Sequence, residues 1–327
     1  MRVCIVGAGA IGGFIGTRLA AFGGCQVSAV ARGATLAALR SQGWRLRQGD
    51  ELITAACTAS ERAEDLGVQD LVIIAVKGPA LTSVAAKLGP LLGPHTLVLP
   101  AMNGVPWWFG AGVPALQGLS LTTVDPGGHV AAAVSLPSVL GCVVHAAAFT
   151  PEPGLVQHRM GQGLIIGEPA GGGSARSTAL GDLLTRGGFE ATVSTDVRKD
   201  IWYKLWGNLT VNPIAAITGA TADRVLDDPL VRAFCSAAML EAAEVGRRIG
   251  CSVDQSPEDR HVVTRRLGSF RPSMEQDVAA GRPIELDAIV GGVVELARHL
   301  GVATPNIDAL LGLTRLFGRV HGLYPSA

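Results

Sequence analysis

Three polar side chains recur at four-residue intervals in an apolar stretch. On a helix, Lys204, Asn208 and Asn212 would form one polar stripe, because residues four apart share a face. An ammonium and two amides are costly to bury without partners, so they must meet solvent, each other or a ligand. A helix with one solvated face is the alternative interpretation. The apolar flanks, and Pro213, which we expect to disturb the helix at Asn212, favour a ligand.

A second group of residues with chemical potential lies near the N-terminus. An apolar run at residues 3–6 leads into a G-x-G-x-x-G pattern, apolar residues then recur at helical spacing, and residues 27–31 are typical of a second strand. In this strand–helix–strand context the pattern predicts a dinucleotide site. The first glycine permits a tight turn, the second lets the backbone approach the pyrophosphate at the helix N-terminus, and the third lets helix and strand pack closely. The residues are Gly7, Ala8, Gly9, Ala10, Ile11 and Gly12.

Arg32 follows the second predicted strand, where NAD-binding proteins usually have Asp or Glu. A guanidinium suits a 2′-phosphate, so the sequence favours NADPH over NADH. A solvated surface arginine is the alternative.

Two further polar residues follow predicted strands. Lys77 comes after the apolar run 71–76, and Asn103 comes after the run 97–102 and before Gly104. Because ligands bind at the carboxyl ends of parallel strands, we expect both on the nicotinamide side. Alternatively, Lys77 faces only solvent, and Asn103 with Gly104 forms a simple turn.

The elements that must position these residues divide the chain in two. Before about residue 196, strand candidates alternate with helical stretches, which predicts a doubly wound, largely parallel sheet. After it, strand signals fade and helical spacing recurs. We therefore predict a Rossmann α/β domain at 1–195 and an all-α domain at 196–327. The remaining candidates are strands at 71–76, 96–100 and 139–145, helices at 82–92, 175–186, 289–300 and 307–317, and a hairpin at 149–169 with turn signals at Pro153-Gly154 and at 161–163.

The composition excludes several classes of protein. Lys+Arg and Asp+Glu both number 27, so no basic surplus favours nucleic acid or an anionic membrane. With 48% hydrophobic and 17% charged residues, disorder is not expected. No apolar run reaches membrane-spanning length. The six cysteines lack metal-ligand spacing and indicate a reducing compartment, so we expect a cytoplasmic protein without a metal.

Together these motifs resemble the ketopantoate reductase (2-dehydropantoate 2-reductase) family over nearly the whole chain. The most specific are W-x-K-L-x-x-N-x-x-x-N-P over residues 202–213 and S-M-x-x-D…E-L-D over 273–287. The resemblance implies a Rossmann domain joined to a helical domain similar to that of 6-phosphogluconate dehydrogenase. It also implies NADPH-dependent reduction of 2-dehydropantoate to pantoate, in pantothenate and coenzyme A biosynthesis.

The resemblance also implies roles for individual residues. Lys204 would be the general acid that donates to the 2-keto oxygen, and Glu285 would bind substrate and help position the lysine. Such a cation would stabilise the negative charge that hydride attack puts on that oxygen. Substrate binding is implied for Asn103, Asn208, Asn212 and Ser273. Cofactor binding is implied for the glycine loop, Arg32, Lys77 and Asn103.

Three bulky residues keep other functions open. Trp107, Trp108 and Phe270 stand where family members are usually smaller or polar, which is compatible with a reductase of another, bulkier or aromatic, 2-oxo acid. A third hypothesis is an NADP-binding sensor without turnover, against which Lys204 and Glu285 argue. A homodimer through the apolar C-terminal helices is compatible with the sequence.

Overall fold

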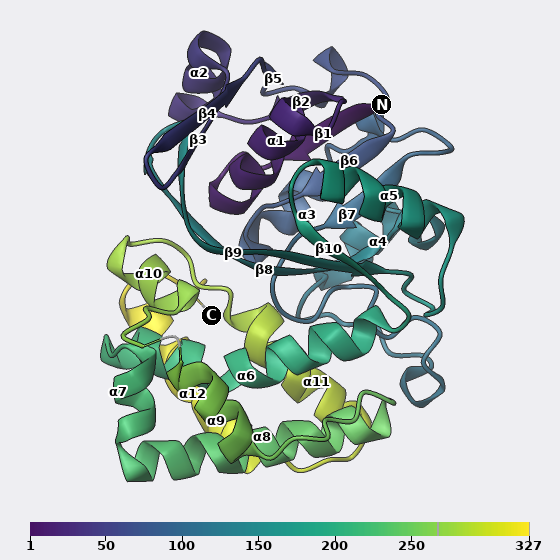
Figure 1. The fold of residues 1–327 in the computed structure, drawn as a ribbon. Helices are drawn as coiled ribbons and strands as arrows, with labels where there is room; N and C mark the ends of the chain where they lie inside the picture. Colours follow the sequence, from purple (N-terminus) through teal and green to yellow (C-terminus); the bar gives the residue numbers. More distant parts are fainter. Residues whose placement is uncertain (267, 327) are drawn as a thin grey trace. The chain divides into compact units, whose positions relative to one another are not determined.

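The computed structural model describes residues 1–266 and 268–326, which form two compact units (Figure 1). The first, here called the α/β unit, comprises Met1–Met102 and Gly128–Asp200. The second, here called the helical unit, comprises Asn103–Gly127 and the chain from Ile201 onward. The chain therefore passes from one unit to the other three times.

The α/β unit contains a five-stranded parallel sheet with the order β5-β2-β1-β6-β7. Val6 pairs with both Val30 and Ile74, so the segments that follow these three strands leave the same edge of the sheet. Together with the strand-free helical unit, this arrangement confirms the predicted combination of a Rossmann-type domain and a helical domain. The strands are β1 (Arg2–Val6), β2 (Gln26–Val30), β5 (Thr58–Ser60), β6 (Leu71–Ile74) and β7 (Leu97–Pro100).

A second, mixed sheet was not predicted. The strand expected at 139–145 in the parallel sheet is instead the start of β8, which pairs antiparallel with β9, and only the isolated bridge Val98–Val139 reaches the first sheet. The hairpin turn at Pro153-Gly154 is confirmed. The second turn predicted at 161–163 is wrong, because Gly161 lies inside β9 beside a register shift at His145. The sheet comprises β3 (Trp44–Gln48), β4 (Glu51–Ala55), β8 (Gly141–Glu152), β9 (Leu155–Gly167) and β10 (Glu190–Ser194).

Helix α1 (Ala10–Phe22) packs against both sheets through small residues. A Cβ added to Gly13 would lie 2.5 Å from Val156 Cγ2 of β9, and one added to Gly16 would lie 2.7 Å from the Trp44 ring of β3. One turn earlier on the same face as Gly16, a Cβ at Gly12 would lie 3.0 Å from Ile5 Cγ2 of β1. The glycines therefore fix α1, and with it the end of the glycine loop, between the sheets.

The other helices of the α/β unit follow the predictions in part. Helix α5 (Ala175–Arg186) has the predicted bounds. The helix predicted at 82–92 is shorter, since α3 (Leu81–Ala85) ends before a separate 3₁₀ turn at Gly89–Leu91, where Pro90 lacks the N–H that a helix needs. The unit also contains α2 (Gly33–Gln42) and α4 (His129–Ala133).

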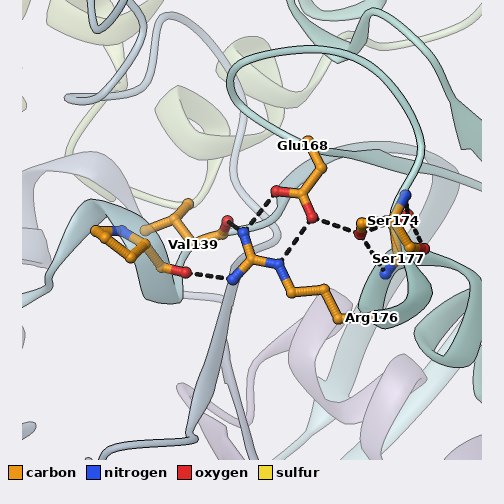
Figure 2. A network of polar contacts seen from close by, with 6 residues as sticks. Val139, Glu168, Ser174, Arg176 and Ser177 are labelled. Carbon is orange, nitrogen blue, oxygen red and sulfur yellow. Dashed lines mark hydrogen bonds and ion pairs between the residues drawn. The ribbon is translucent and has the colours of Figure 1, made fainter.

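A polar network ties the end of β9 to the start of α5 (Figure 2). Arg176 donates from Nε to Glu168 Oε1 at 2.7 Å and from Nη2 to Oε2 at 2.5 Å, and it also donates to the carbonyls of Pro137 and Val139. Ser174, the N-cap of α5, donates to the same carboxylate. The bonds from Arg176 lower the pKa of Glu168 although partial burial opposes them. The network therefore stabilises one end of the second sheet.

The helical unit contains seven α-helices and no strand within its described residues. Helix α6 continues through Pro213 to Thr218, so the expected disturbance at Asn212 is wrong. Proline leaves the Leu209 carbonyl without its helical donor, but residues 209–216 are all buried and packing keeps the segment helical. No described helix is long and apolar enough to cross a membrane. The helices are α6 (Val197–Thr218, in this unit from Ile201), α7 (Ala222–Asp227), α8 (Pro229–Arg248), α9 (Pro257–Arg265), α10 (Ser273–Ala279), α11 (Gly292–His299) and α12 (Pro305–Val320).

Candidate active site

The three glycines of the N-terminal loop have different surroundings. Gly7 has φ +96°, and a Cβ there would lie 2.9 Å from the Ala75 carbonyl oxygen. A Cβ at Gly12 would lie 2.0 Å from the Gly7 carbonyl oxygen, so the fold itself requires both glycines. A Cβ at Gly9 would meet no atom within 4 Å. The N-terminus of α1 is thus open at Gly9, where backbone N–H groups could approach a phosphate.

Arg32 and Lys77 lie at the same sheet edge as this loop. They follow β2 and β6, whose last residues both pair with the last residues of β1. Both side chains are exposed. Within the described part of the chain, no hydrogen bond or ion pair involves the Arg32 guanidinium. The α/β unit therefore presents an open glycine loop and two cations along one edge.

Asn103 and Lys204 are joined directly in the helical unit. Lys204 Nζ, on α6, donates a hydrogen bond to Asn103 Oδ1 at 2.8 Å, and both residues are half-buried. Asn103 follows β7 of the α/β unit but belongs to the compact body that contains Lys204. The bond fixes one of the three protons of the ammonium and so orients the group.

The segment that carries Asn103 is held by further contacts within the helical unit. Val105 donates its N–H to the Ala288 carbonyl at 2.8 Å. The carboxylate of Glu295, on α11, accepts hydrogen bonds from the N–H groups of Thr122 (2.8 Å) and Thr123 (2.9 Å). Burial opposes ionisation of Glu295, but the hydrogen bonds from Thr122 and Thr123 outweigh it and lower the pKa of the carboxyl. Sequence reasoning missed Glu295, because its partners lie more than 170 positions away.

The other predicted substrate residues also lie in the helical unit. Asn208 and Asn212 share the face of α6 with Lys204, and Asn212 is buried. Ser273 is the first residue of α10, and Glu285 is a buried residue just before the π-helical turn Asp287–Gly291. Among the described residues, the side chains of Asn208, Asn212 and Ser273 have no hydrogen-bond partner. Their hydrogen-bonding groups are therefore not used by other described side chains or backbone groups.

Comparisons with known proteins identify the family. The model for "Ketopantoate reductase PanE/ApbA" matches residues 3–171, and the model for its C-terminal domain matches residues 196–317. The 2-dehydropantoate 2-reductase of Mesorhizobium japonicum is 41% identical over 99% of this chain and 100% of its own. A Ralstonia solanacearum MolK2 protein of known structure, assigned as a ketopantoate reductase, is 52% identical with a TM-score of 0.95 over 99% of each chain.

More distant structures share the fold. A ketopantoate reductase from Ralstonia eutropha JMP134 is 27% identical, with a TM-score of 0.82 over 98% of this chain and 100% of its own. D-mandelate dehydrogenase, in a ternary structure with NADH and anilino(oxo)acetate, is 20% identical, with a TM-score of 0.85 over 99% of this chain and 100% of its own. At that identity the likeness concerns the fold alone. On the two family models and the full-length relative, the chain belongs to the ketopantoate reductase family of oxidoreductases.

Proposed function

We propose that this protein catalyses the NADPH-dependent reduction of 2-dehydropantoate to pantoate, with Lys204 as general acid. The observation that carries the proposal is the 2.8 Å bond from Lys204 Nζ to Asn103 Oδ1. The same helix face presents the amides of Asn208 and Asn212, which have no hydrogen-bond partner among the described residues. The name of the 41% identical relative, 2-dehydropantoate 2-reductase, supports the same reaction.

Lys204 performs the proton transfer in this proposal. Reduced nicotinamide, when bound, supplies a hydride to the 2-keto carbon. The keto oxygen then gains negative charge, and the ammonium of Lys204 stabilises that charge and gives the oxygen a proton, so the ketone becomes a hydroxyl group. Asn103 accepts a different proton of the same ammonium and keeps the group oriented. Electrostatic stabilisation and acid catalysis each contribute about 10²–10⁴-fold.

The remaining polar residues of the helical unit bind the substrate. Asn208, Asn212 and Ser273 together offer two amides and a hydroxyl, which suit the hydroxyl and carboxylate groups of a small 2-oxo acid. Glu285, a buried carboxylate, accepts a hydrogen bond from the substrate and helps set the position of the lysine.

The α/β unit is proposed to hold NADPH. The open space at Gly9 fits a pyrophosphate, because no atom of the described residues fills the position that a side chain would take. Arg32 presents an exposed guanidinium without a protein partner among the described residues, which fits a 2′-phosphate. Lys77 follows β6 along the same edge and would contact the cofactor.

A second candidate function is reduction of a bulkier 2-oxo acid by the same residues. Trp107 and Phe270 are half-buried, and Phe270 packs against a cluster that includes Val211 of α6, the helix that carries Lys204. Trp108 is 3% exposed and therefore contributes to the core more than to a pocket. The structure of D-mandelate dehydrogenase with anilino(oxo)acetate supports the view that this fold accommodates aromatic ligands.

A steady-state assay of NADPH oxidation separates these functions. The wild-type protein is tested with 2-dehydropantoate beside a panel of aliphatic and aromatic 2-oxo acids. The proposal expects the highest kcat/KM with 2-dehydropantoate, and a higher value with an aromatic acid would favour the second candidate. Nucleotide binding without consumption of NADPH with any acid would indicate a sensor.

The lysine assignment needs its own variant and control. Lys204→Ala is expected to lower kcat by about 10²–10⁴-fold while the Kd for NADPH, measured by fluorescence titration, stays unchanged. Lys199→Ala is the matched control, because Lys199 is an exposed lysine on the same helix that pairs with Asp196 at 3.5 Å. Undiminished turnover in Lys204→Ala would refute the assignment.

A further inference from the structure

The C-terminal end of the chain returns to the segment that carries Glu285. After α12, the N–H groups of Leu323 and Tyr324 both donate to the Gly318 carbonyl, at 2.7 and 3.2 Å, and the chain turns back. A Cβ at Gly318 would lie 2.7 Å from the Tyr324 Cβ, so this turn is tightly packed. The Leu323 carbonyl then accepts a hydrogen bond from the N–H of Ile284 at 3.0 Å, immediately before Glu285.

A second bond reaches the other side of Glu285. The Tyr324 hydroxyl donates to Asp287 Oδ1 at 2.6 Å, and Asp287 begins the π-helical turn. Burial, with the bond to Asp287, raises the pKa of Tyr324 to about 12, so the hydroxyl keeps its proton near neutral pH and remains a donor. The returning segment thus holds the chain at positions 284 and 287, on both sides of the carboxylate.

The same π-helical turn supports the Asn103 segment. The Ala288 carbonyl, one residue after Asp287, accepts the N–H of Val105 at 2.8 Å. The backbone at Gly104 lies so close that an added Cβ would be 2.4 Å from the Ala288 carbonyl oxygen. Any movement of this turn therefore displaces the residue next to Asn103 and, through it, the acceptor of the Lys204 hydrogen bond.

We propose that Tyr324 is a positioning residue for the reaction, holding the π-helical turn that sets Glu285 and Asn103 relative to Lys204. The inference rests on the proposed function, which assigns these three residues to substrate and proton transfer. The Tyr324 hydroxyl acts through Asp287, whose carboxylate accepts its hydrogen bond. π-Helical turns are frequent at functional sites, which agrees with a supporting role for this one.

The first test removes the hydroxyl and keeps the ring. Tyr324→Phe is expected to lower kcat by about 10- to 100-fold, since small misplacements of catalytic groups have effects of this size, while the Kd for NADPH stays unchanged. Asp287→Asn keeps an acceptor oxygen for the tyrosine and should retain more activity than Asp287→Ala. The double variant Tyr324→Phe/Asp287→Ala should lose no more than Asp287→Ala alone, because both changes remove one interaction.

Tyr203→Phe is the matched control. Tyr203 is the other tyrosine of the chain, it lies in the helical unit, and its hydroxyl donates to Gln255 at 2.9 Å. We expect its kcat to stay within about twofold of wild type, as for other surface changes. An equal loss in both variants, or additive losses in the double variant, would overturn the positioning role of Tyr324.

Hydrogen–deuterium exchange provides a readout that does not depend on turnover. Tyr324→Phe should speed exchange at the amides of Val105 and Ile284, which donate to Ala288 and Leu323, and leave the amides of β1 unchanged. Unchanged exchange at Val105, or faster exchange there with kcat preserved, would refute the inference. A wild-type protein inactive on every 2-oxo acid would instead refute the proposed function.

Discussion

Gly104→Ala is expected to affect both the stability of the helical unit and its chemistry. Gly104 has φ +88°, and an added Cβ would lie 2.4, 2.5 and 2.7 Å from the carbonyl oxygen, carbonyl carbon and Cβ of Ala288. These atoms belong to backbone or sit directly on it, so they cannot rotate away. Restoring an ordinary contact of 3.4 Å requires a retreat of about 1 Å. A retreat of that size breaks the 2.8 Å bond from Val105 N–H to Ala288.

The free energy of unfolding should fall by about 2–5 kcal/mol. Left-handed backbone costs a non-glycine residue about 1–2 kcal/mol, and an unsatisfied buried N–H costs about 1–3 kcal/mol. Gly118→Ala, in the same segment, isolates the first contribution, because Gly118 has φ +81° and no atom within 4 Å of an added Cβ. It should therefore lose only about 1–2 kcal/mol.

Urea unfolding of both variants, together with steady-state kinetics, measures these effects. Because Asn103 precedes Gly104, a displacement of about 1 Å should also lower kcat by about 100-fold in Gly104→Ala and leave Gly118→Ala close to wild type. Equal destabilisation of the two variants would refute the steric reasoning. Full activity in a destabilised Gly104→Ala would refute the link between this contact and the Asn103–Lys204 pair.

Three further predictions concern the α/β unit. Arg32→Asp should raise the KM for NADPH by at least about tenfold, since a charge-assisted bond to the 2′-phosphate is replaced by repulsion; an unchanged KM would contradict the NADPH preference. Gly9→Ala should change the free energy of unfolding by no more than about 1 kcal/mol, because the added Cβ meets no atom, yet raise the Kd for NADPH. Gly12→Ala is its control in the same motif and should fail to fold stably. An unaltered Kd for NADPH in Gly9→Ala would be evidence against the loop as the pyrophosphate site. The bonds from Arg176 hold the pKa of Glu168 below its unfolded value, so the pair should stabilise the fold above that value and lose its effect as the pH falls through the lowered pKa. Glu168→Gln should accordingly cost about 1 kcal/mol or less at pH 7 and progressively less as the pH falls, and a cost that does not change with pH would show that the charge is not involved.

Local patterns predicted the parts of the fold whose causes are local. The strand–glycine loop–helix start, helix α5 and the four-residue spacing on α6 all depend on neighbours within a few positions. The second sheet could not be predicted in this way, because β3 pairs with β9 about 110 residues later. The sequence around Gly161 is typical of a turn for the same reason. The glycine lies at an irregularity in the pairing of β9 with β8, and this irregularity depends on a partner strand that local patterns do not include.

The candidate site shows the same division. Lys204, Asn208 and Asn212 were recognisable as a stripe because a helix repeats within the sequence itself. Glu295 and Ala288 hold the segment that carries Asn103. One is a charged and the other an apolar residue of a kind common in helices, so no local sequence pattern marks either of them. Pro213 misled the sequence reasoning because its cost to a helix is local, whereas the packing that offsets it is not.

The membership of residues 103–127 in the helical unit bears on recombination between homologues. A chimera joined at residue 195 would inherit Asn103 from one parent and Lys204 from the other, and would mix the two sides of the Val105–Ala288 and Thr122–Glu295 bonds. A chimera joined at all three points where the chain changes unit, after residues 102, 127 and 200, would instead take this segment and the helices it contacts from the same parent. Hybrid libraries cut at these three points should therefore contain more folded and active members than libraries cut once.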